Sequence, residues 1–154
     1  MEHVTVDDVD TQGELNRRGL SEPLGTSDFA INHYHLEPGE GFSGGRHTHL
    51  DQEEAFYVIS GTATFEVTQE PTGEPETVEV GAGEVVRFAP GEYQTGSNEG
   101  DEDVEALALG APADSTDVRV PGPCPECGQE SLAITFEGGE MGTVCPECGA
   151  EPGA

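Results

Sequence analysis

The stretch "GFSGGRHTHLDQEEAFYVISG", residues 41–61, holds two histidines, two adjacent glutamates and a glycine at each end. His47 and His49 are two residues apart, so on an extended chain their side chains leave the same face. Glu54 can reach them from the strand that follows. Two histidines and one carboxylate with open coordination positions suit Fe(II), Mn, Ni, Co or Zn. The alternative is a polar surface loop in a chain rich in carboxylates.

The segments around this stretch have the pattern of short strands. Between residues 28 and 109, Gly and Pro turns separate the runs "FAINHYHL", "AFYVIS", "TATFEV", "ETVEV", "VVRF" and "VEALAL". Short strands at regular spacing predict an all-β sandwich or barrel. Residues 1–27 are polar and are expected to form an N-terminal arm. Residues 110–123, rich in Pro and small polar side chains, are expected to be a linker.

The order of residues in 41–61 resembles the first motif of the cupin superfamily, whose members are small jelly-roll β-barrels. That motif is a glycine, five residues, His-x-His, three or four residues, Glu, six residues and a glycine. Gly41, His47, His49, Glu54 and Gly61 satisfy every position, and Glu54 has the required spacing whereas its neighbour does not. The resemblance implies a barrel over 28–109, a divalent metal bound inside it, and pairing into a homodimer.

The second cupin motif is matched less completely. Gly83, Gly91 and Asn98 fall in place, and Pro90 stands one position late. Gln94 occupies the position where the family commonly has a histidine ligand. Three interpretations stay open: Gln94 is a fourth ligand, Gln94 hydrogen-bonds a bound water or substrate, or the site has lost its metal. A glutamine oxygen is a harder ligand than imidazole and favours oxygen-loving metals.

Further polar side chains are candidates for contact with a ligand. Basic residues are scarce, so Arg46 and Arg87 are expected either to pair with carboxylates or to meet an anionic substrate by a bidentate contact. Tyr93, next to Gln94, can line the mouth of a cavity. His33 and His35 share one face of their strand, and the sequence leaves open whether that face looks inward.

The C-terminal segment, residues 124–149, carries the four cysteines in two "CPECG" repeats: Cys124, Cys127, Cys145 and Cys148. The spacing C-x₂-C-x₁₇-C-x₂-C predicts a structural zinc site, and "SLAITFEGGEMGTV" predicts two strands joined at Gly138–Gly139. This is the pattern of a zinc ribbon, whose metal supplies folding free energy to a segment too short to fold alone. A rubredoxin-like iron site and disulfides are the alternatives.

The net charge of the chain restricts the classes of partner that are expected. Asp and Glu number 32 against five arginines and no lysine, for a formal net charge of -27. Such a surface is typical of halophiles, in which concentrated salt screens the self-repulsion; partial disorder is the alternative. Nothing in this surface would neutralise phosphates, so nucleic acid and anionic membranes are not expected as partners. With no secretory signal or membrane span in the sequence, a cytoplasmic location is expected.

Together these features predict a metal-binding cupin, possessing a zinc ribbon, that acts on or binds a small molecule. The resemblance allows a metal-dependent oxygenase or isomerase. A non-catalytic ligand-binding or regulatory cupin whose ribbon docks a partner is the alternative, and a purely structural barrel requires an empty site. Fold alone does not choose among these classes.

Overall fold

The computed structural model describes residues 1–13 and 16–152, and in them the chain is almost entirely β. Two short helices, η1 (Val6–Asp8) and α1 (Ser21–Leu24), lie near the N-terminus. The strands are β1 (Arg17–Gly19), β2 (Ala30–Leu36), β3 (Thr48–His49), β4 (Glu53–Ser60), β5 (Thr62–Thr68), β6 (Glu76–Gly81), β7 (Val85–Phe88), β8 (Tyr93–Ser97), β9 (Val104–Ala111), β10 (Val118–Pro121), β11 (Ser131–Glu137) and β12 (Glu140–Val144). The predicted all-β fold is confirmed.

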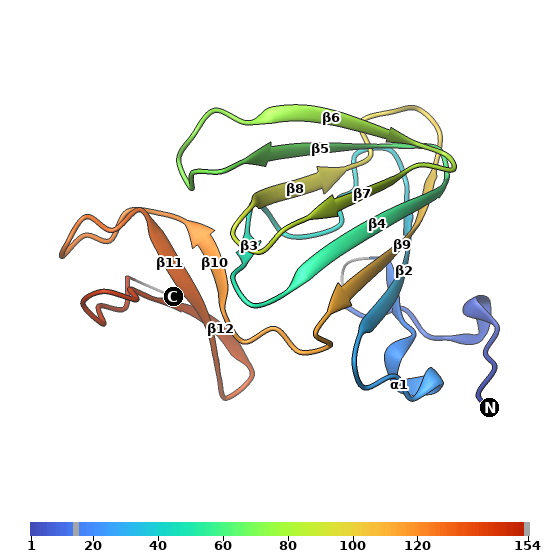
Figure 1. Cartoon of the computed structure of the whole chain (residues 1–154), viewed down its shortest axis with the longest axis horizontal. Coiled ribbons are helices and arrows are strands. Elements are labelled where there is room, and N and C mark those ends of the chain that lie inside the picture. Colours follow the sequence, from blue (N-terminus) through green and yellow to red (C-terminus); the bar gives the residue numbers. More distant parts are fainter. Residues whose placement is uncertain (14–15, 153–154) are drawn as a thin grey trace.

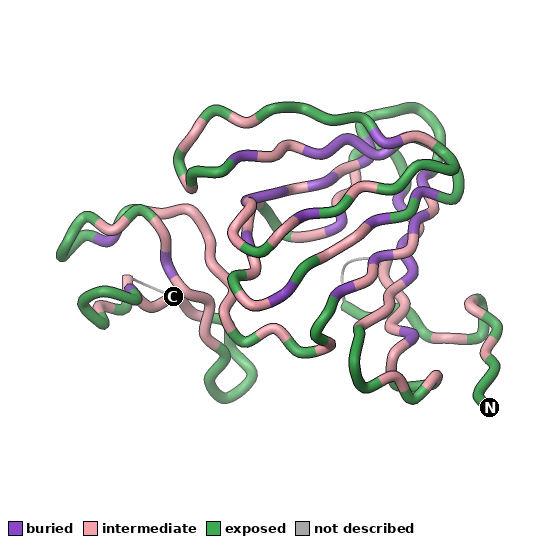
Figure 2. Tube along the Cα trace, in the orientation of Figure 1, coloured by how far each residue is buried: buried purple, intermediate pink, exposed green. Residues whose placement is uncertain are grey.

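Two antiparallel sheets form the barrel. One has the strand order β1-β2-β9-β4-β7 and the other β6-β5-β8, and Figure 1 shows them facing each other. Each strand predicted between residues 28 and 109 is present, because apolar side chains alternate along it and fill the space between the sheets. Figure 2 shows the buried residues along β2, β5, β8 and β9, whereas β6 at the edge of its sheet is mostly exposed.

Aromatic rings make up the centre of the barrel. Phe42 stacks on Phe65 at a centroid distance of 5.4 Å, and Phe56 lies 5.1 Å from both rings. Each such ring contributes about 1.5–3 kcal/mol by leaving water. Strand β8 passes beside the cluster at Gly96, where a Cβ atom would lie 2.4 Å from Phe65 Cε1. The rings can therefore pack only because this position of β8 has no side chain.

Two residues of the matched motifs have structural roles. Gly61 turns the chain between β4 and β5 with φ of +76°, and a Cβ there would lie 2.4 Å from the carbonyl oxygen of Asp103. Asn98 is fully buried, and its amide nitrogen donates to the carbonyl oxygens of Leu36 and Glu102 at 3.0 and 2.9 Å. Both residues fix loops at the end of the barrel away from the histidines.

A third sheet, of order β12-β11-β10-β3, joins the C-terminal segment to the barrel. The hairpin of β11 and β12 turns at Gly138–Gly139 as predicted, with Phe136 paired to Met141. Strand β10 lies within the predicted linker and pairs with β3, so Val118 stands opposite His49. The cysteine segment is thus connected to the barrel by a continuous ladder of backbone hydrogen bonds, as the left half of Figure 1 shows.

The N-terminal segment also takes part in the barrel. Strand β1, within the predicted arm, pairs with β2, so that Arg17 stands opposite Tyr34. Edge pairing gives this polar segment its backbone partners although it has few apolar residues to bury. The division into arm, barrel, linker and ribbon stays a prediction, and the structure differs from it in placing strands in both the arm and the linker. In the described part of the chain, every helix is too short to cross a membrane.

Candidate metal centre and cavity

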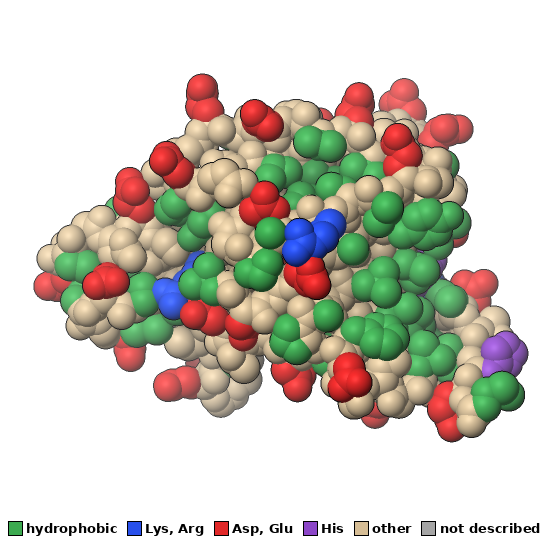
Figure 3. All heavy atoms as spheres, viewed as in Figure 1, with side chains coloured by type: hydrophobic (Ala, Val, Ile, Leu, Met, Phe, Trp, Pro, Cys, Tyr) green, Lys and Arg blue, Asp and Glu red, His purple; other side chains and the backbone are tan. Residues whose placement is uncertain are grey.

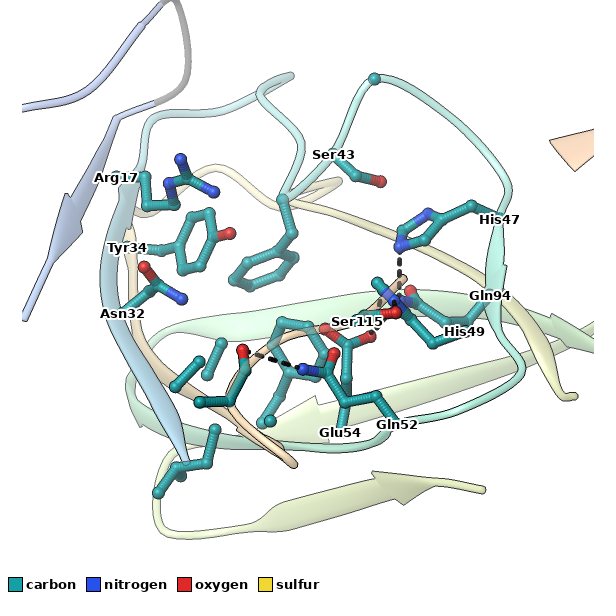
Figure 4. Close-up of a pocket in the computed structure, with 18 residues that line it drawn as sticks. Arg17, Asn32, Tyr34, Ser43, His47, His49, Gln52, Glu54, Gln94 and Ser115 are labelled. Carbon is teal, nitrogen blue, oxygen red and sulfur yellow. Dashed lines mark hydrogen bonds and ion pairs between the residues drawn. The ribbon is translucent and has the colours of Figure 1, made fainter. Parts of the chain in front are cut away.

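His47, His49 and Glu54 come together at one end of the barrel. His49 lies on the two-residue strand β3, and His47, just before it, exchanges two backbone hydrogen bonds with Gln94 of β8, at 3.1 and 2.9 Å. Glu54 enters from β4. One ligand atom from each of the three side chains lies within 4.8 Å of the others. Figure 4 shows the two imidazoles and Gln94 grouped on one side of a cavity.

Hydrogen bonds fix which ring nitrogen of each histidine is free. His47 Nδ1 lies 2.9 Å from the carbonyl oxygen of Gly45, which can only accept, so Nδ1 carries the proton. His49 Nδ1 lies 2.8 Å from Ser115 Oγ, and the Ser115 hydroxyl itself donates to Asp51 Oδ1 at 2.7 Å. The Ser115 oxygen therefore accepts from His49. In both rings Nε2 keeps its lone pair and faces the cluster, which is the arrangement of a metal ligand.

The charges around these rings support the same arrangement. Hydrogen bonds from the Ser115 hydroxyl and the Thr116 backbone N–H hold the pKa of Asp51 well below its ordinary range, so this carboxylate is ionised and accepts. Burial lowers the pKa of His49, which favours the neutral imidazole that a metal requires. His49 Nε2 lies 3.5 Å from Glu54 Oε2, the nearest carboxylate oxygen of the cluster.

Gln94 lies against the cluster and is 3% exposed. Its amide nitrogen donates to Glu54 Oε2 at 3.2 Å and lies 3.5 Å from His47 Nε2. Its amide oxygen is buried and has no hydrogen-bond partner among residues 1–13 and 16–152. The two amide atoms exchange places by a half-turn, and their assignment follows from the surroundings. With the oxygen turned to the cluster, Gln94 would offer it to a metal ion as a fourth donor, in place of the amide N–H that now donates to Glu54.

The neighbouring glutamate points the other way. Glu53 Oε2 lies 2.5 Å from Arg87 Nε on the outer surface of β4 and β7, whereas Glu54 faces the cavity. Period-two alternation along β4 accounts for the difference. Tyr57 is correspondingly exposed, and Phe56 belongs to the core, as expected for an inward Glu54.

The cluster forms part of the wall of a cavity of about 370 Å³. The opposite wall is made by Asn32 and Tyr34 of β2 and by Arg17 of β1, and Figure 4 shows the Arg17 guanidinium directed into the cavity beside the Tyr34 ring. Burial raises the pKa of Tyr34, so its hydroxyl remains a donor at neutral pH. Gln52 also lines the cavity, and its amide nitrogen donates to the Pro112 carbonyl oxygen at 2.7 Å.

The three residues predicted to contact substrate lie outside the lining of this cavity. Arg46 forms an ion pair with Glu66 at 3.3 Å. Arg87 pairs with Glu53, as described above. Tyr93 is 6% exposed, and its hydroxyl donates to Ser131 Oγ at 2.8 Å, across the junction with the cysteine segment. The structure therefore gives each of these side chains a protein partner.

His33 and His35 lie on the face of β2 opposite to Asn32 and Tyr34, which face the cavity. His35 Nε2 lies 2.9 Å from Asp103 Oδ2, and this hydrogen bond raises the pKa of His35. His33 is buried, and desolvation lowers its pKa. Neither imidazole is placed to substitute for the histidine that Gln94 replaces.

The four cysteines form a second cluster, in which the sulfur atoms lie within 4.8 Å of one another. Cys124 Sγ lies 3.6 Å from Cys148 Sγ, and Cys127 Sγ lies 3.5 Å from Cys145 Sγ. A disulfide would require about 2.05 Å, whereas sulfurs bound tetrahedrally to zinc at about 2.3 Å are separated by nearly 4 Å. A hydrogen bond from the Cys148 backbone lowers the pKa of Cys145 to about 6. The pKa of Cys127 is raised to about 12, against a hydrogen bond from the Gln129 backbone, by hydrogen bonds with the neighbouring thiols. The cluster is consistent with a zinc ribbon.

Three residues of the site were not anticipated from the sequence. Arg17 comes from the predicted arm, and Asp51 and Ser115 orient His49 from outside the matched motif. The sequence signal for Arg17 was its rarity as one of five cations together with "RRG", where strand alternation must send Arg17 and Arg18 to opposite faces. Ser115 had no comparable signal, because it is 66 residues from His49 in the chain.

The chain has the same fold as several solved structures, of which three are named here. An uncharacterized conserved protein with a double-stranded beta-helix domain from Klebsiella pneumoniae has a TM-score of 0.59 and 23% identity, with 77% of this chain and 89% of that chain covered. A sugar phosphate isomerase from a cupin superfamily, from Silicibacter pomeroyi, has a TM-score of 0.66 and 17% identity, with 95% and 94% covered. Oxalate decarboxylase of Bacillus subtilis, in a structure concerned with its Mn(II) centres, has a TM-score of 0.57 and 22% identity, with 73% and 29% covered.

These identities establish the fold and no more. Among curated proteins, no sequence matches this chain. The family model described as "Cupin domain" matches residues 32–110, which contain the histidines, Glu54 and Gln94. Since that range is just over half of the 154 residues, the chain belongs to the cupin family.

Proposed function

We propose that this cupin holds one divalent metal ion through His47, His49 and Glu54, with Gln94 as a fourth donor, and binds a small molecule beside it. The observation that carries the proposal is the convergence of the three ligand atoms, within 4.8 Å, on the wall of a cavity of about 370 Å³. Cavities of this size accept small molecules.

The donor set suits a first-row divalent ion. Two neutral imidazole nitrogens, one carboxylate and one amide oxygen are compatible with Mn, Fe(II), Co, Ni or Zn. Such an ion, when bound, polarises an oxygen atom of the ligand as a Lewis acid. The chain itself positions the two histidines through the Gly45 carbonyl and the Ser115–Asp51 pair, and the rings of Phe42 and Phe56 line the cavity beside them.

A metal-dependent oxygenase or isomerase is the enzyme class that this arrangement supports. A ligand-binding or regulatory cupin is the second candidate, and the exposed tip of the C-terminal hairpin favours it. Phe136 and Met141 are paired there and are 73% and 66% exposed, which suits a hairpin that docks on a partner.

Oxygen uptake distinguishes the enzyme from the binding module. It is measured with the protein loaded with Fe(II), Mn, Ni or Co, over a panel of small molecules. Consumption of oxygen supports the enzyme, and tight retention of a ligand without turnover supports the binding module.

The cysteine cluster is proposed to hold a structural zinc ion. The cysteine segment buries little apolar surface, with a core of Cys124, Leu132 and Cys145 packed against Val120 and Ala150. So small a core needs a metal to supply folding free energy. The ion would hold the two knuckles together, in which Gly128 N and Gly149 N donate to the carbonyl oxygens of Cys124 and Cys145.

Pairing into a homodimer is supported by the outer face of the five-stranded sheet. Tyr57 and Val85 stand opposite each other on β4 and β7 and are 41% and 66% exposed, next to the exposed Ile59. In Figure 3, hydrophobic side chains gather over the right-hand part of this face, and acidic side chains lie around them and toward the edges of the view. A second copy of the chain would cover this apolar surface. The test is the sedimentation of wild type and Val85→Glu: a dimeric wild type and a monomeric variant would support the pairing.

Metal analysis of the purified full chain tests the proposed function. We expect two ions per chain, one of them zinc. His47→Ala combined with His49→Ala should remove the first ion and leave the zinc, whereas Cys145→Ser should lower the zinc content and leave the first. A wild-type protein that retains one ion, lost with Cys145→Ser, and that takes up no further ion when Mn(II), Fe(II), Co(II) or Ni(II) is added, would show that the barrel binds no metal.

A further inference from the structure

Arg17 is the feature of the cavity that the proposed function does not use. Of the five arginines, Arg46, Arg87 and Arg119 form ion pairs with carboxylates, and Arg18 donates to the Val9 carbonyl oxygen at 2.9 Å. Arg17 has no ion pair within residues 1–13 and 16–152; its Nη2 donates to Gln12 Oε1 at 3.3 Å, and its buried Nε has no hydrogen-bond partner there. In a chain with 32 acidic residues, a guanidinium that lines a cavity and has no carboxylate partner among the described residues is unusual.

Among the described residues, the cavity wall has no acidic side chain beside Arg17. Glu54 is the one acidic side chain among the described residues that line the cavity, and it faces the imidazoles. The other neighbours of Arg17 are the Tyr34 hydroxyl, which burial keeps protonated, and the Asn32 amide. Figure 4 shows these three polar ends on one side of the cavity, with His47, His49 and Gln94 on the other.

The two sides of the cavity therefore suit different chemical groups, which could be the two ends of one ligand. The Nη–H groups of a guanidinium form a planar fork that matches the two oxygens of a carboxylate. The metal side accepts a neutral or anionic oxygen donor. A net charge of -27 repels an anion from the rest of the surface, so affinity for an anion must come from cations inside the cavity.

We propose that the cavity binds a small organic acid, with a carboxylate held by the Arg17 guanidinium and the Tyr34 hydroxyl and a second oxygen donor at the His47–His49–Glu54 metal. This inference rests on the proposed metal site and adds the chemical class of its ligand. Arg17 is then a specificity-determining residue. Its position on the edge strand β1 ties the N-terminal segment to the ligand, because Arg17 stands opposite Tyr34 in the sheet.

The test uses the full chain loaded with Mn(II), with malonate as the probe and its neutral diamide, malonamide, as the matched compound. Loss of the free Mn(II) signal in electron paramagnetic resonance first establishes that the ion binds. Isothermal titration then measures malonate affinity for wild type, Arg17→Gln and Arg18→Gln. The last variant changes the net charge equally but alters a side chain on the other face of β1.

We expect malonate to bind wild type more tightly than malonamide does. Arg17→Gln should weaken malonate binding by about 10- to 100-fold, the range for a hydrogen bond to a charged group. The affinities for Mn(II) and malonamide should be unchanged in Arg17→Gln, and Arg18→Gln should bind malonate like wild type. Tyr34→Phe, which keeps the ring packed on Phe42, should also weaken malonate binding and provides a second variant if Arg17→Gln does not fold.

Two contrary results are distinguishable. If Mn(II) binds at full stoichiometry but malonate binds Arg17→Gln and Tyr34→Phe as it binds wild type, or does not bind wild type, the organic-acid proposal is wrong and the metal site stands. If wild type takes up no Mn(II) or other divalent ion, the proposed function fails and the organic-acid proposal, which needs the ion opposite Arg17, fails with it.

Discussion

The Ser115 hydroxyl oxygen lies 2.8 Å from His49 Nδ1, although the two residues are 66 positions apart in the chain. Ser115 stands in the segment that leads from β9 to β10, and β10 pairs with the strand that carries His49. The connection between barrel and cysteine segment therefore also orients an expected metal ligand.

Replacing Ser115 tests this orientation. Ser115→Ala removes the oxygen that accepts from His49 Nδ1–H, which frees the ring to rotate or to change tautomer. Loss of such an outer partner typically weakens metal binding by about 10- to 100-fold. Thr116→Ala is the matched control, since Thr116 Oγ1 contacts Asp51 at 2.9 Å but not the imidazole. Chelator competition should show the larger loss for Ser115→Ala; equal effects of the two variants would contradict the orienting role.

Gln94→His should tighten binding of a divalent ion. Imidazole nitrogen is the better ligand for first-row ions than an amide oxygen, and position 94 already lies beside His47 Nε2. The measurement is again chelator competition, with Gln94→Ala as the comparison. An affinity that neither substitution alters would mean that Gln94 contacts a bound water or ligand and not the metal.

Salt should stabilise the fold. Self-repulsion among the 32 acidic residues is screened as the Debye length falls from about 10 Å at 0.1 M to about 3 Å at 1 M. We expect the melting temperature to rise continuously from low to molar KCl. A melting temperature that is flat or falls over this range would contradict the interpretation of the surface as an adaptation to high salt.

Gly61→Ala should destabilise the barrel by more than about 1 kcal/mol, because φ is +76° and the new Cβ would meet a backbone oxygen. For a chain of this size that corresponds to a fall in melting temperature of at least about 2–4 °C. Gly44→Ala is the control, since a Cβ there meets nothing within 4 Å. Equal melting temperatures for the two variants would show that this motif glycine is not required by its backbone.

The sequence predicted what depends on local spacing. The six residues between Glu54 and Gly61 selected Glu54 over Glu53, and the structure directs Glu54 into the cavity and Glu53 to Arg87. Alternating apolar residues predicted six barrel strands, and Gly138–Gly139 predicted the C-terminal hairpin.

Other features depend on long-range pairing and had little local signal. Strand β8, "YQTGS", contains few apolar residues, since Gly96 leaves room for Phe65 in place of contributing a side chain. Strands β1 and β10 lie in segments whose polar and Pro-rich composition resembles loops, and each becomes a strand by pairing with a distant edge. Arg17 reaches the cavity only through that pairing.

The central claim, that the barrel binds a metal through His47, His49 and Glu54, is tested most directly by comparing the two adjacent glutamates. Glu54→Gln and Glu53→Gln remove the same charge one residue apart, on opposite faces of β4. Mn(II) affinity is measured for both by competition with a chelator. We expect Glu54→Gln to lose more than about 100-fold, beyond the range for an outer partner, and Glu53→Gln to stay close to wild type. A larger loss for Glu53→Gln, or equal affinity for both variants and wild type, would contradict the claim.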